Sequence, residues 1–366
     1  MRILPFVSSE SGYYCTFLKR NQETITDMTA NKKNIDWGGL GFNYMPVDRH
    51  IRYTWESGKW NSGRLLKKDE ITLPIAATCL HYGQACFEGL KAFCWRDGTV
   101  RVFRPEENSR RINSTADHIQ CPEIPEKLFL DAIKRVIKAN LDYVPPYGTK
   151  GSLYIRPLLI GTGAGIGVGP SNRYDFIVLV VPVGNYYKEG ISPVRAIISE
   201  DYDRAAPKGT GHIKMSGNYA ASLKQAALAK KQGFPIVLYP DAKTRSCVDE
   251  FGTSNFIGIT RSGVYVTPSS DTILPSVTNK SLMQIAADLG IPVERREISL
   301  EELPEFAEIG ACGTAVIITP IGELVFKTRI FKYGNECGHV LRRLYDRLTG
   351  IQFGEEPDTH KWLRKI

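Results

Sequence analysis

Two charged residues in the second half of the chain stand where they could act on a ligand. Lys214 lies in GTGHIKMSGNYAASL, where small neighbours leave room for a ligand against the backbone. Glu250, in CVDEFGTSNF, follows a predicted strand and precedes a turn. A carboxylate fixed there could pair with a protonated ring nitrogen. Taken singly, each residue also fits an ordinary role, a surface charge for the lysine and a solvated turn acid for the glutamate.

A glycine-rich segment, GTGAGIGVG at residues 161–169, could cradle a phosphate group after a strand. No register of it gives G-x-G-x-x-G, and no Gly-Lys-Ser/Thr follows, so we interpret it as a structural or substrate-gating loop. The sequence also lacks H-E-x-x-H, G-x-S-x-G and C-x-x-C. Zinc hydrolases, serine hydrolases and structural metal sites therefore have little support, and we expect no metal.

The composition is that of a globular protein of two domains. The chain has 366 residues and a net charge of +8, but its Lys and Arg residues are scattered, which argues against nucleic-acid binding. No apolar run reaches the length of a membrane-spanning helix, so we expect no membrane partner. The spacing of the eight cysteines suggests free thiols and a cytoplasmic protein.

Periodic segments indicate which elements must position these residues. Two apolar runs joined across Asp97-Gly98 predict a hairpin, and Pro105 suits the first turn of a helix. Helices are expected at Glu126–Val144, after an N-cap at Asn218, after an N-cap at Thr278, and near residues 339–348, with a capping box at Ser299 and Glu302. Strands are expected at His50–Glu56, Ser152–Ile160 and Asp175–Val183. Because strands and helices do not alternate steadily, the fold class is expected to be α+β.

The expected domain boundaries follow from changes in composition. The composition of residues 1–27 differs from that of the sequence after Met28, and we interpret them as a disordered N-terminal extension. A small α+β domain is expected over 28–183, an interdomain linker over 184–193, and a large domain over 194–366.

An ordered set of motifs gives a resemblance that spans about residues 36–350. The motifs are HYGQACFEGLKAF, VFRPEENSRRI, SLYIRPLLIG, KMSGNYAASL, DEFGTSNF, ILPSVTNKSL and GACGTAVIITPIG. In this order and spacing they resemble the branched-chain aminotransferases, which are fold-type IV enzymes dependent on pyridoxal 5'-phosphate (PLP). The resemblance implies two domains with the cofactor in the cleft between them, and a homodimer.

The resemblance also implies a role for each cofactor-binding residue. Lys214 matches the catalytic lysine that forms the Schiff base with PLP, and burial near cations would free its neutral amine. Glu250 matches the partner of the ring nitrogen, and Tyr219 matches that of the phenolate oxygen. The phosphate would be held by Arg104, by the backbone of Val277 and Thr278 at a helix start, and by the hydroxyl of Thr314.

The substrate side follows in the same way. Aromatic and basic residues are expected to form a pocket that accepts an aliphatic side chain and the distal carboxylate of glutamate: Phe42, Tyr82, Phe87, Tyr154 and Arg156. Thr253 and the backbone of Ala315 would hold the α-carboxylate. The implied reaction is a ping-pong transfer of nitrogen from L-Leu, L-Ile or L-Val to 2-oxoglutarate.

The sequence departs from the family pattern at one point, and alternative functions remain open. Some relatives carry a C-x-x-C redox pair where this chain has Val316 and Thr319, so no redox switch is expected there. A D-amino acid aminotransferase or an aminodeoxychorismate lyase would share the fold, although both are usually shorter and lack the HYGQACFEGLKAF pattern. A binding protein that has kept the fold without catalysis is the alternative from another class.

Overall fold

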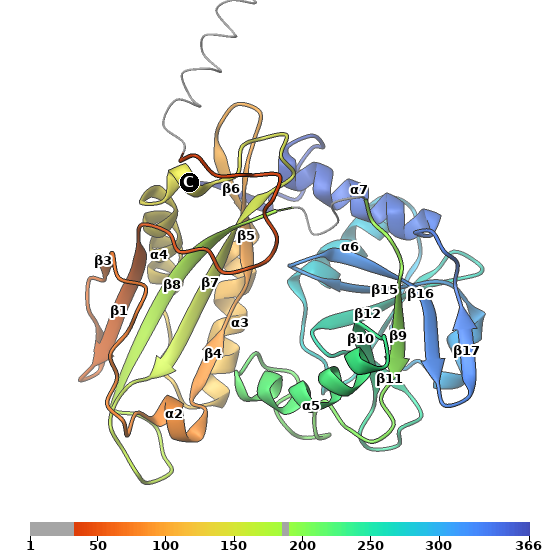
Figure 1. The fold of residues 1–366 in the computed structure, drawn as a ribbon, viewed down its shortest axis with the longest axis horizontal. Coiled ribbons are helices and arrows are strands. Elements are labelled where there is room, and N and C mark those ends of the chain that lie inside the picture. The colour runs from red at the N-terminus through yellow and green to blue at the C-terminus, as the bar shows by residue number, and fades with distance from the viewer. Residues whose placement is uncertain (1–32, 185–189) are drawn as a thin grey trace, which may run out of the picture.

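The computed structural model describes residues 33–184 and 190–366, which form two sheets flanked by helices (Figure 1). The predicted extension at residues 1–27 lies outside the described residues, as does half of the predicted linker, residues 185–189. Among the described residues, no helix is long and apolar enough to cross a membrane. The mixture of helices and sheets confirms the α+β fold class.

The first sheet is built mainly from the N-terminal half of the chain. Its main path runs β18-β6-β5-β7-β8-β1-β2, with β3 paired to β1 and β4 paired to β7. The strands are β1 (His50–Glu56), β2 (Lys59–Trp60), β3 (Arg64–Leu66), β4 (Ala85–Phe87), β5 (Leu90–Cys94), β6 (Val100–Phe103), β7 (Ser152–Gly161), β8 (Arg173–Val183) and β18 (Leu363–Lys365). The last strand returns from the end of the chain to pair antiparallel with β6.

The second sheet closes on itself as a barrel. Its path runs β11-β10-β9-β16-β15-β12-β13-β14, and an additional pairing of β11 with β12 completes the ring. The strands are β9 (Val194–Ile198), β10 (Ile236–Pro240), β11 (Val248–Phe251), β12 (Ser254–Thr260), β13 (Tyr265–Pro268), β14 (Val293–Arg296), β15 (Phe306–Gly313), β16 (Ile317–Phe326) and β17 (Arg329–Lys332). The short hairpin that joins β11 to β12 places Glu250 directly opposite Asn255.

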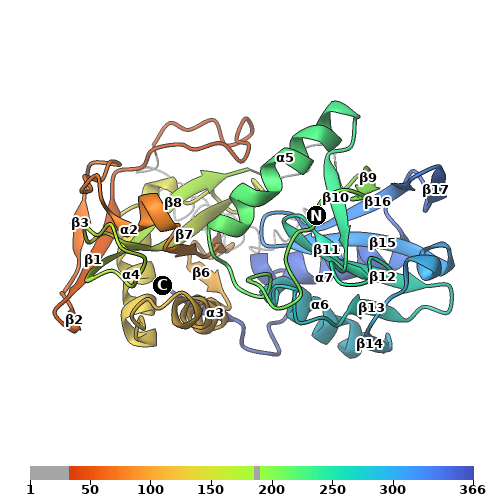
Figure 2. The same cartoon turned by 90° about the horizontal axis from the view of Figure 1, so that it is seen from below.

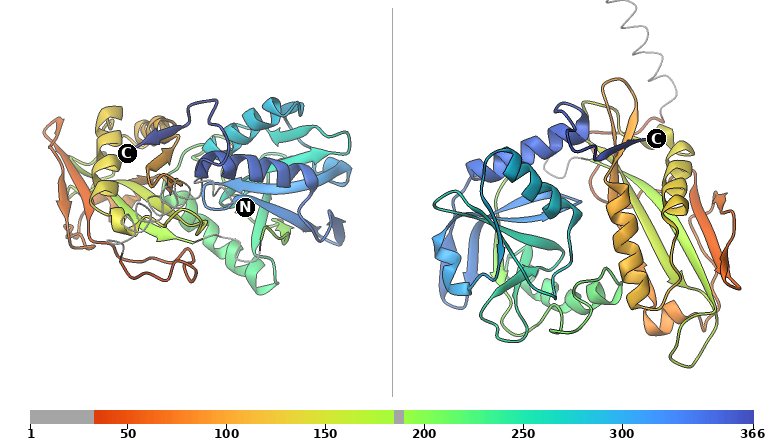
Figure 3. Two further views of the ribbon diagram at one scale, coloured as in Figure 1. Left: turned by 90° about the horizontal axis from the view of Figure 1, so that it is seen from above. Right: turned by 180° about the vertical axis from the view of Figure 1, so that it is seen from behind.

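Helices cover both sheets and connect them. The helices are α2 (Thr78–Tyr82), α3 (Pro105–His118), α4 (Glu126–Lys138), α5 (Gly217–Lys231), α6 (Val277–Asp288) and α7 (His339–Phe353), with 3-10 turns at Leu141–Tyr143 and Leu300–Glu305. Buried side chains of α3 and α4 share one hydrophobic core with the first sheet, and those of α6 and α7 share another with the barrel. Seen from below, α5 extends from the first sheet toward the barrel (Figure 2), while α6 and α7 lie along one side of the barrel (Figure 3).

Several local predictions are confirmed, and two helix caps are corrected. The hairpin across Asp97-Gly98 forms, and the capping box at Ser299 and Glu302 is present. The helix expected to start after Thr278 is capped instead by Ser276, whose extended backbone lets its side chain accept the Asn279 N–H.

The second correction concerns Asn218, which is not the N-cap of α5. That helix begins at Gly217 after Ser216. The Asn218 amide instead donates to the carbonyls of Thr210 and Ile213 at 2.7 and 3.0 Å, so it ties down the loop that leads to Lys214.

Candidate active site

The backbone around Lys214 is fixed by contacts with the first sheet and with α3. Its N–H donates to Thr115 Oγ1 on α3 at 3.0 Å, and its carbonyl accepts the N–H of Phe87 at 3.3 Å. An isolated antiparallel bridge joins Cys86 of β4 to Met215. Lys214 therefore lies where the first sheet meets the start of α5.

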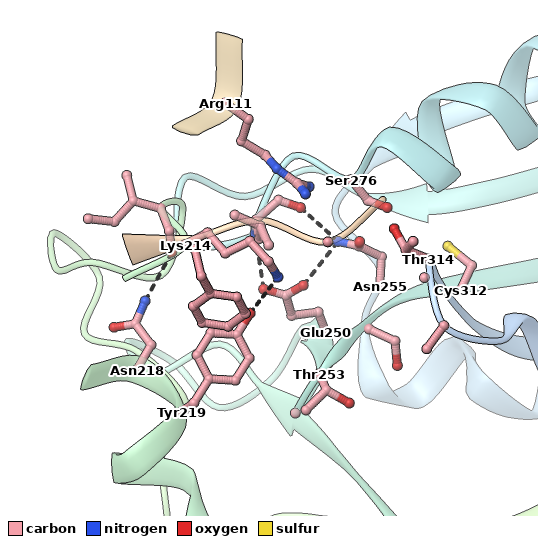
Figure 4. A pocket seen from close by; sticks show the side chains of 18 of the residues that line it. Arg111, Lys214, Asn218, Tyr219, Glu250, Thr253, Asn255, Ser276, Cys312 and Thr314 are labelled. Atoms are coloured by element: carbon pink, nitrogen blue, oxygen red, sulfur yellow. Dashed lines mark hydrogen bonds between the residues drawn. The ribbon is translucent and has the colours of Figure 1, made fainter. Parts of the chain in front are cut away.

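The Lys214 side chain extends into a cavity (Figure 4). Its Nζ donates to the Tyr219 hydroxyl at 2.7 Å and lies 4.9 Å from the centre of the Phe87 ring. Burial, together with the positive charges of Arg111 and Arg156, lowers the pKa of Lys214 to about 8. Burial raises the pKa of Tyr219 to about 12, so this partner stays a neutral phenol. The pair therefore offers an amine that loses its proton far more easily than an exposed lysine does.

Glu250 enters the same cavity from the barrel and is 3% exposed. Its Oε1 accepts the N–H of Leu274 at 3.0 Å and forms an ion pair with Arg204 Nη2 at 2.7 Å. Its Oε2 accepts the side-chain amide of Asn255 at 3.0 Å. Burial raises the pKa of Glu250 to about 7, although the positive charge of Arg204 opposes this rise.

The cavity has a volume of about 330 Å³ and is lined from both sheets. Most of the residues predicted for the site line it: Phe42, Phe87, Tyr154, Arg156, Lys214, Tyr219, Glu250 and Thr253, with Thr314 and Ala315 on the connection between β15 and β16. Arg111 and Arg204, which were not predicted, line it as well. Gly89 also lines it, and a side chain there would collide with the Tyr154 hydroxyl, which an added Cβ would approach to 2.2 Å.

Aromatic rings and one guanidinium form the side of the cavity expected to hold the substrate. The Phe42 and Tyr154 rings pack edge to face, with centroids 5.0 Å apart. Arg156 Nη2 donates to the Tyr154 hydroxyl at 2.9 Å, and its guanidinium lies 4.7 Å from the centre of the Phe87 ring. An apolar wall and a cation thus stand side by side.

Tyr82 is the one predicted substrate residue that the structure does not bring to this cavity. It ends the short helix α2, is 39% exposed, and donates its hydroxyl to the carbonyl of Ile166. The glycine-rich loop at residues 161–169 is thereby held against α2, which also contacts it through the Thr78 N–H and the Gly163 carbonyl at 3.2 Å.

The predicted phosphate ligand Arg104 does not line the cavity, and Arg111 does. Arg104 precedes α3 in a left-handed conformation (φ 46°), donates to Ser281 Oγ at 2.8 Å and packs over the Trp362 ring. Arg111 is seven residues further on, within α3. Arg104 was predicted as the phosphate ligand, and the position of Arg111 in the cavity makes it the alternative candidate for that role.

A buried network holds Arg111 in place. Glu88 is fully buried and pairs with both Nε and Nη2 of Arg111 at 2.7 Å, while Asn108 donates to the same carboxylate at 2.7 Å. Burial alone would raise the pKa of Glu88, but the charge and hydrogen bonds of Arg111 outweigh it and hold that pKa below its usual range. The Phe-Glu-Gly turn in the sequence was the available signal, because a carboxylate in such apolar surroundings requires a cation.

The other predicted phosphate ligands lie around a smaller cavity that adjoins the first. Val277, Thr278 and Thr314 line it, and Gly89 and Thr314 line both cavities. Val277 and Thr278 are the first residues of α6, where backbone N–H groups have no partner within the helix. Arg111 Nη1 donates to the carbonyl of Pro275, just before α6, at 2.9 Å, so a cation lies beside a helix N-terminus, which suits an anion.

Lys91 also contacts the site, although no motif in the sequence points to it. Its side chain reaches from β5 to the barrel and donates to the carbonyl of Ala315 at 2.8 Å. Burial lowers the pKa of Lys91 to about 8. Lys91 thus links the first sheet to Ala315, the residue whose N–H is expected to bind the α-carboxylate.

These groups fit PLP by their chemistry. The ring nitrogen needs an acidic partner, and Oε2 of Glu250 has a single protein donor. The aldehyde needs an amine with a low pKa, which Lys214 provides. The phosphate needs cationic and N–H donors, which Arg111 and the start of α6 supply.

Comparisons with known proteins agree with this chemistry. The model of the family "Amino-transferase class IV" matches residues 85–324. The chain is 44% identical to the branched-chain-amino-acid aminotransferase of Haemophilus influenzae over 342 residues, covering 91% of this chain and 99% of that protein. Its fold is similar to the crystal structure of the Escherichia coli branched-chain amino acid aminotransferase, with a TM-score of 0.72 and 27% identity over 85% of this chain and 98% of that one. It is equally similar, at 25% identity and a TM-score of 0.72, to the T.th. branched-chain amino acid aminotransferase with pyridoxamine 5'-phosphate, covering 85% of this chain and 97% of that one.

Proposed function

Because this chain belongs to the amino-transferase class IV family, we propose that it exchanges amino groups between branched-chain L-amino acids and 2-oxoglutarate. The single observation that carries the proposal is the set of Lys214, Tyr219 and Glu250 in one cavity beside an apolar wall. PLP is the cofactor. When bound, it supplies the carbonyl that takes up the nitrogen and a ring that withdraws electrons from the reacting carbon.

Residues of the chain bind the cofactor and transfer the proton. The Lys214 amine carries the cofactor and then moves the proton from Cα of the amino acid, which its low pKa allows. Glu250 holds a proton at the ring nitrogen through its carboxylate. The phosphate is bound by Arg111, by the N–H groups of Val277 and Thr278, and by Thr314.

Substrate recognition requires one pocket to accept two kinds of side chain. The rings of Phe42, Phe87 and Tyr154 surround an aliphatic chain, which favours Leu, Ile and Val. Arg156, with the Tyr154 hydroxyl, binds the distal carboxylate when glutamate or 2-oxoglutarate occupies the same space. Thr253 and the N–H of Ala315 hold the α-carboxylate, with Lys91 fixing the Ala315 carbonyl from behind.

Lys214→Ala tests this function directly. We expect the variant to lose the visible absorbance band of the bound cofactor and the exchange between L-leucine and 2-oxoglutarate, because no other lysine of the described residues lines the cavity. Lys230→Ala, on the exposed part of the same helix α5, is the matched control and should keep both.

The substrate range separates this proposal from its relatives. Wild-type enzyme should turn over L-leucine in preference to D-alanine and aminodeoxychorismate in steady-state assays. Inert L-Leu, L-Ile and L-Val together would refute the assignment, and preferred turnover of either competitor would identify a D-amino acid aminotransferase or a lyase instead.

A homodimer is also part of the proposal, supported by an exposed apolar surface. Five large side chains gather where α2 meets the glycine-rich loop, and we refer to them as the α2-loop patch: Ile75, Leu80, Tyr82, Ile166 and Val168, exposed by 90, 61, 39, 74 and 87%. Backbone contacts between Ala77 and Ala164 hold the two segments together. Apolar surface of this kind on a folded protein is typical of an interface.

We further propose that the enzyme works in the cytoplasm. All seven cysteines among the described residues are free thiols, which favours a reducing compartment.

A further inference from the structure

Arg204 is a buried cation that the reaction described above does not use. It lies on the loop between β9 and α5 and lines the cavity beside Glu250, with 9% of its side chain exposed against 5% for Glu250. Its Nη2 lies 2.7 Å from Glu250 Oε1. The same nitrogen contacts the carbonyls of Gly211, at 3.2 Å, and of Thr272.

These contacts fix which part of the Glu250 carboxylate remains available. Oε1 forms the ion pair with Arg204 and accepts the N–H of Leu274, whereas among the described residues Oε2 has one donor, the amide of Asn255. A carboxylate oxygen offers two lone pairs, so Oε2 keeps one for a further donor. Arg204 thus acts on the oxygen away from the position where the ring nitrogen would bind.

Charge is the second consequence of this arrangement. Burial raises the pKa of Glu250 to about 7 even beside Arg204, so the carboxylate is ionised at a slightly alkaline pH and would hold a proton more strongly without this cation. Arginine keeps its charge at every working pH, and its contact with Glu250 is direct. A less basic carboxylate leaves a shared proton on the ring nitrogen, where it strengthens the ring as an electron acceptor.

We propose that Arg204 is a positioning residue that keeps Glu250 ionised and aimed through Oε2, so that the proton stays on the ring nitrogen of the cofactor. The inference rests on the proposed role of Glu250. The competing explanation is that Arg204 only clamps its own loop through the carbonyls of Gly211 and Thr272, which would require no effect on the proton.

The test measures the protonation of the cofactor's ring nitrogen in the full-length protein. Wild type, Arg204→Gln and Arg204→Lys are reconstituted with PLP carrying ¹⁵N in the ring, and the ¹⁵N chemical shift is measured at one slightly alkaline pH. Wild type and Arg204→Lys should show a protonated ring nitrogen, and Arg204→Gln an unprotonated one. We also expect kcat of Arg204→Gln to fall roughly 10–100-fold with little change in KM, the scale found when a supporting partner behind a site group is lost.

Arg245→Gln provides the matched control for loop anchoring. Arg245 pairs with Asp203 and donates to the carbonyl of Ser199 at 2.9 Å, so its loss disturbs the same loop without touching Glu250. Its ¹⁵N shift should equal that of wild type.

Two results would overturn the inference. One is an unchanged protonated nitrogen in cofactor-loaded Arg204→Gln. If that variant does not retain the cofactor, Arg204→Lys decides, because an unprotonated nitrogen beside a retained cation contradicts the charge argument. Failure of the proposed function is recognised separately, as absence of L-leucine turnover by wild type, and leaves the comparison of ¹⁵N shifts intact.

Discussion

At the scale of single residues, Arg104, which precedes α3, and Arg111, which lies on it, are predicted to behave differently. Arg111 lines the cavity, whereas Arg104 is engaged with Ser281 and Trp362 outside it. Arg111→Gln should raise the Kd for PLP roughly 10–100-fold, because a hydrogen bond to a charged group contributes about 1.5–3 kcal/mol. Arg104→Gln should leave this Kd close to the wild-type value. Fluorescence titration of the apoprotein with PLP measures both.

Pyridoxal without its phosphate serves as the ligand control for this pair. Both variants should bind it like wild type, because neither arginine is expected to contact the ring. A larger loss in Arg104→Gln than in Arg111→Gln would restore the assignment made from the sequence.

The residues that could be predicted from sequence are those that sit in short, ordered motifs. Lys214, Tyr219 and Glu250 were selected in this way, and they lie in one cavity. Arg204 and Lys91 were missed because neither has a local signal. Their partners, Glu250 and the Ala315 carbonyl, are distant in sequence and meet them only after the sheets assemble.

At the scale of elements, the N-terminus of α6 links stability to phosphate binding. Ser276 Oγ accepts the Asn279 N–H at 3.1 Å and so holds the first turn in which Val277 and Thr278 present their N–H groups. Ser276→Ala should lower the free energy of unfolding of the apoprotein by about 1 kcal/mol, a typical cost of losing a cap. It should also weaken PLP binding several-fold, because the N–H groups are less well ordered. Chemical denaturation and cofactor titration measure the two effects.

Ser299→Ala is the control for this prediction. Ser299 caps the 3-10 turn at Leu300–Glu305 through a capping box, away from the cavity. Its loss should lower stability on a similar scale and leave the Kd for PLP unchanged. Equal Kd values for Ser276→Ala and wild type would contradict a role of the α6 N-terminus in binding phosphate.

Elements set by local chemistry could be predicted well, and those set by distant pairing could not. The Asp-Gly turn at residues 97–98 and the capping box at Ser299 each encode their structure within a few residues. By contrast, β18 pairs with β6 across most of the chain, and the barrel depends on the parallel pairing of β9 with β16, which are more than 100 residues apart. The cap of α6 was misplaced because Ser276 and Thr278 are both good caps, and only backbone geometry distinguishes them.

At the scale of the whole molecule, the α2-loop patch predicts self-association through a surface far from the barrel. Ile166 and Val168 are the side chains on the glycine-rich loop within this patch, and they are exposed by 74 and 87%. In a symmetric dimer each would be buried twice, and burial of one such side chain contributes roughly 1.5–3 kcal/mol. Ile166→Lys should therefore raise the dissociation constant of the dimer at least about 100-fold. Light scattering coupled to size-exclusion chromatography over a dilution series measures this constant.

Ile330→Lys distinguishes a specific interface from non-specific hydrophobic association. Ile330 is also an exposed isoleucine, at 56%, but it lies on β17, at the opposite end of the molecule from α2 (Figure 1). A charge there should leave the dimer intact, because only a surface that meets its own copy is sensitive to it. If wild type is a monomer at micromolar concentration, or if both substitutions weaken association equally, the α2-loop patch is not the interface. If Ile166→Lys alone yields monomers, the glycine-rich loop contacts the second subunit. Because Tyr82 is held against this loop, it would then lie at the dimer interface, which explains why it lies outside the cavity of its own chain.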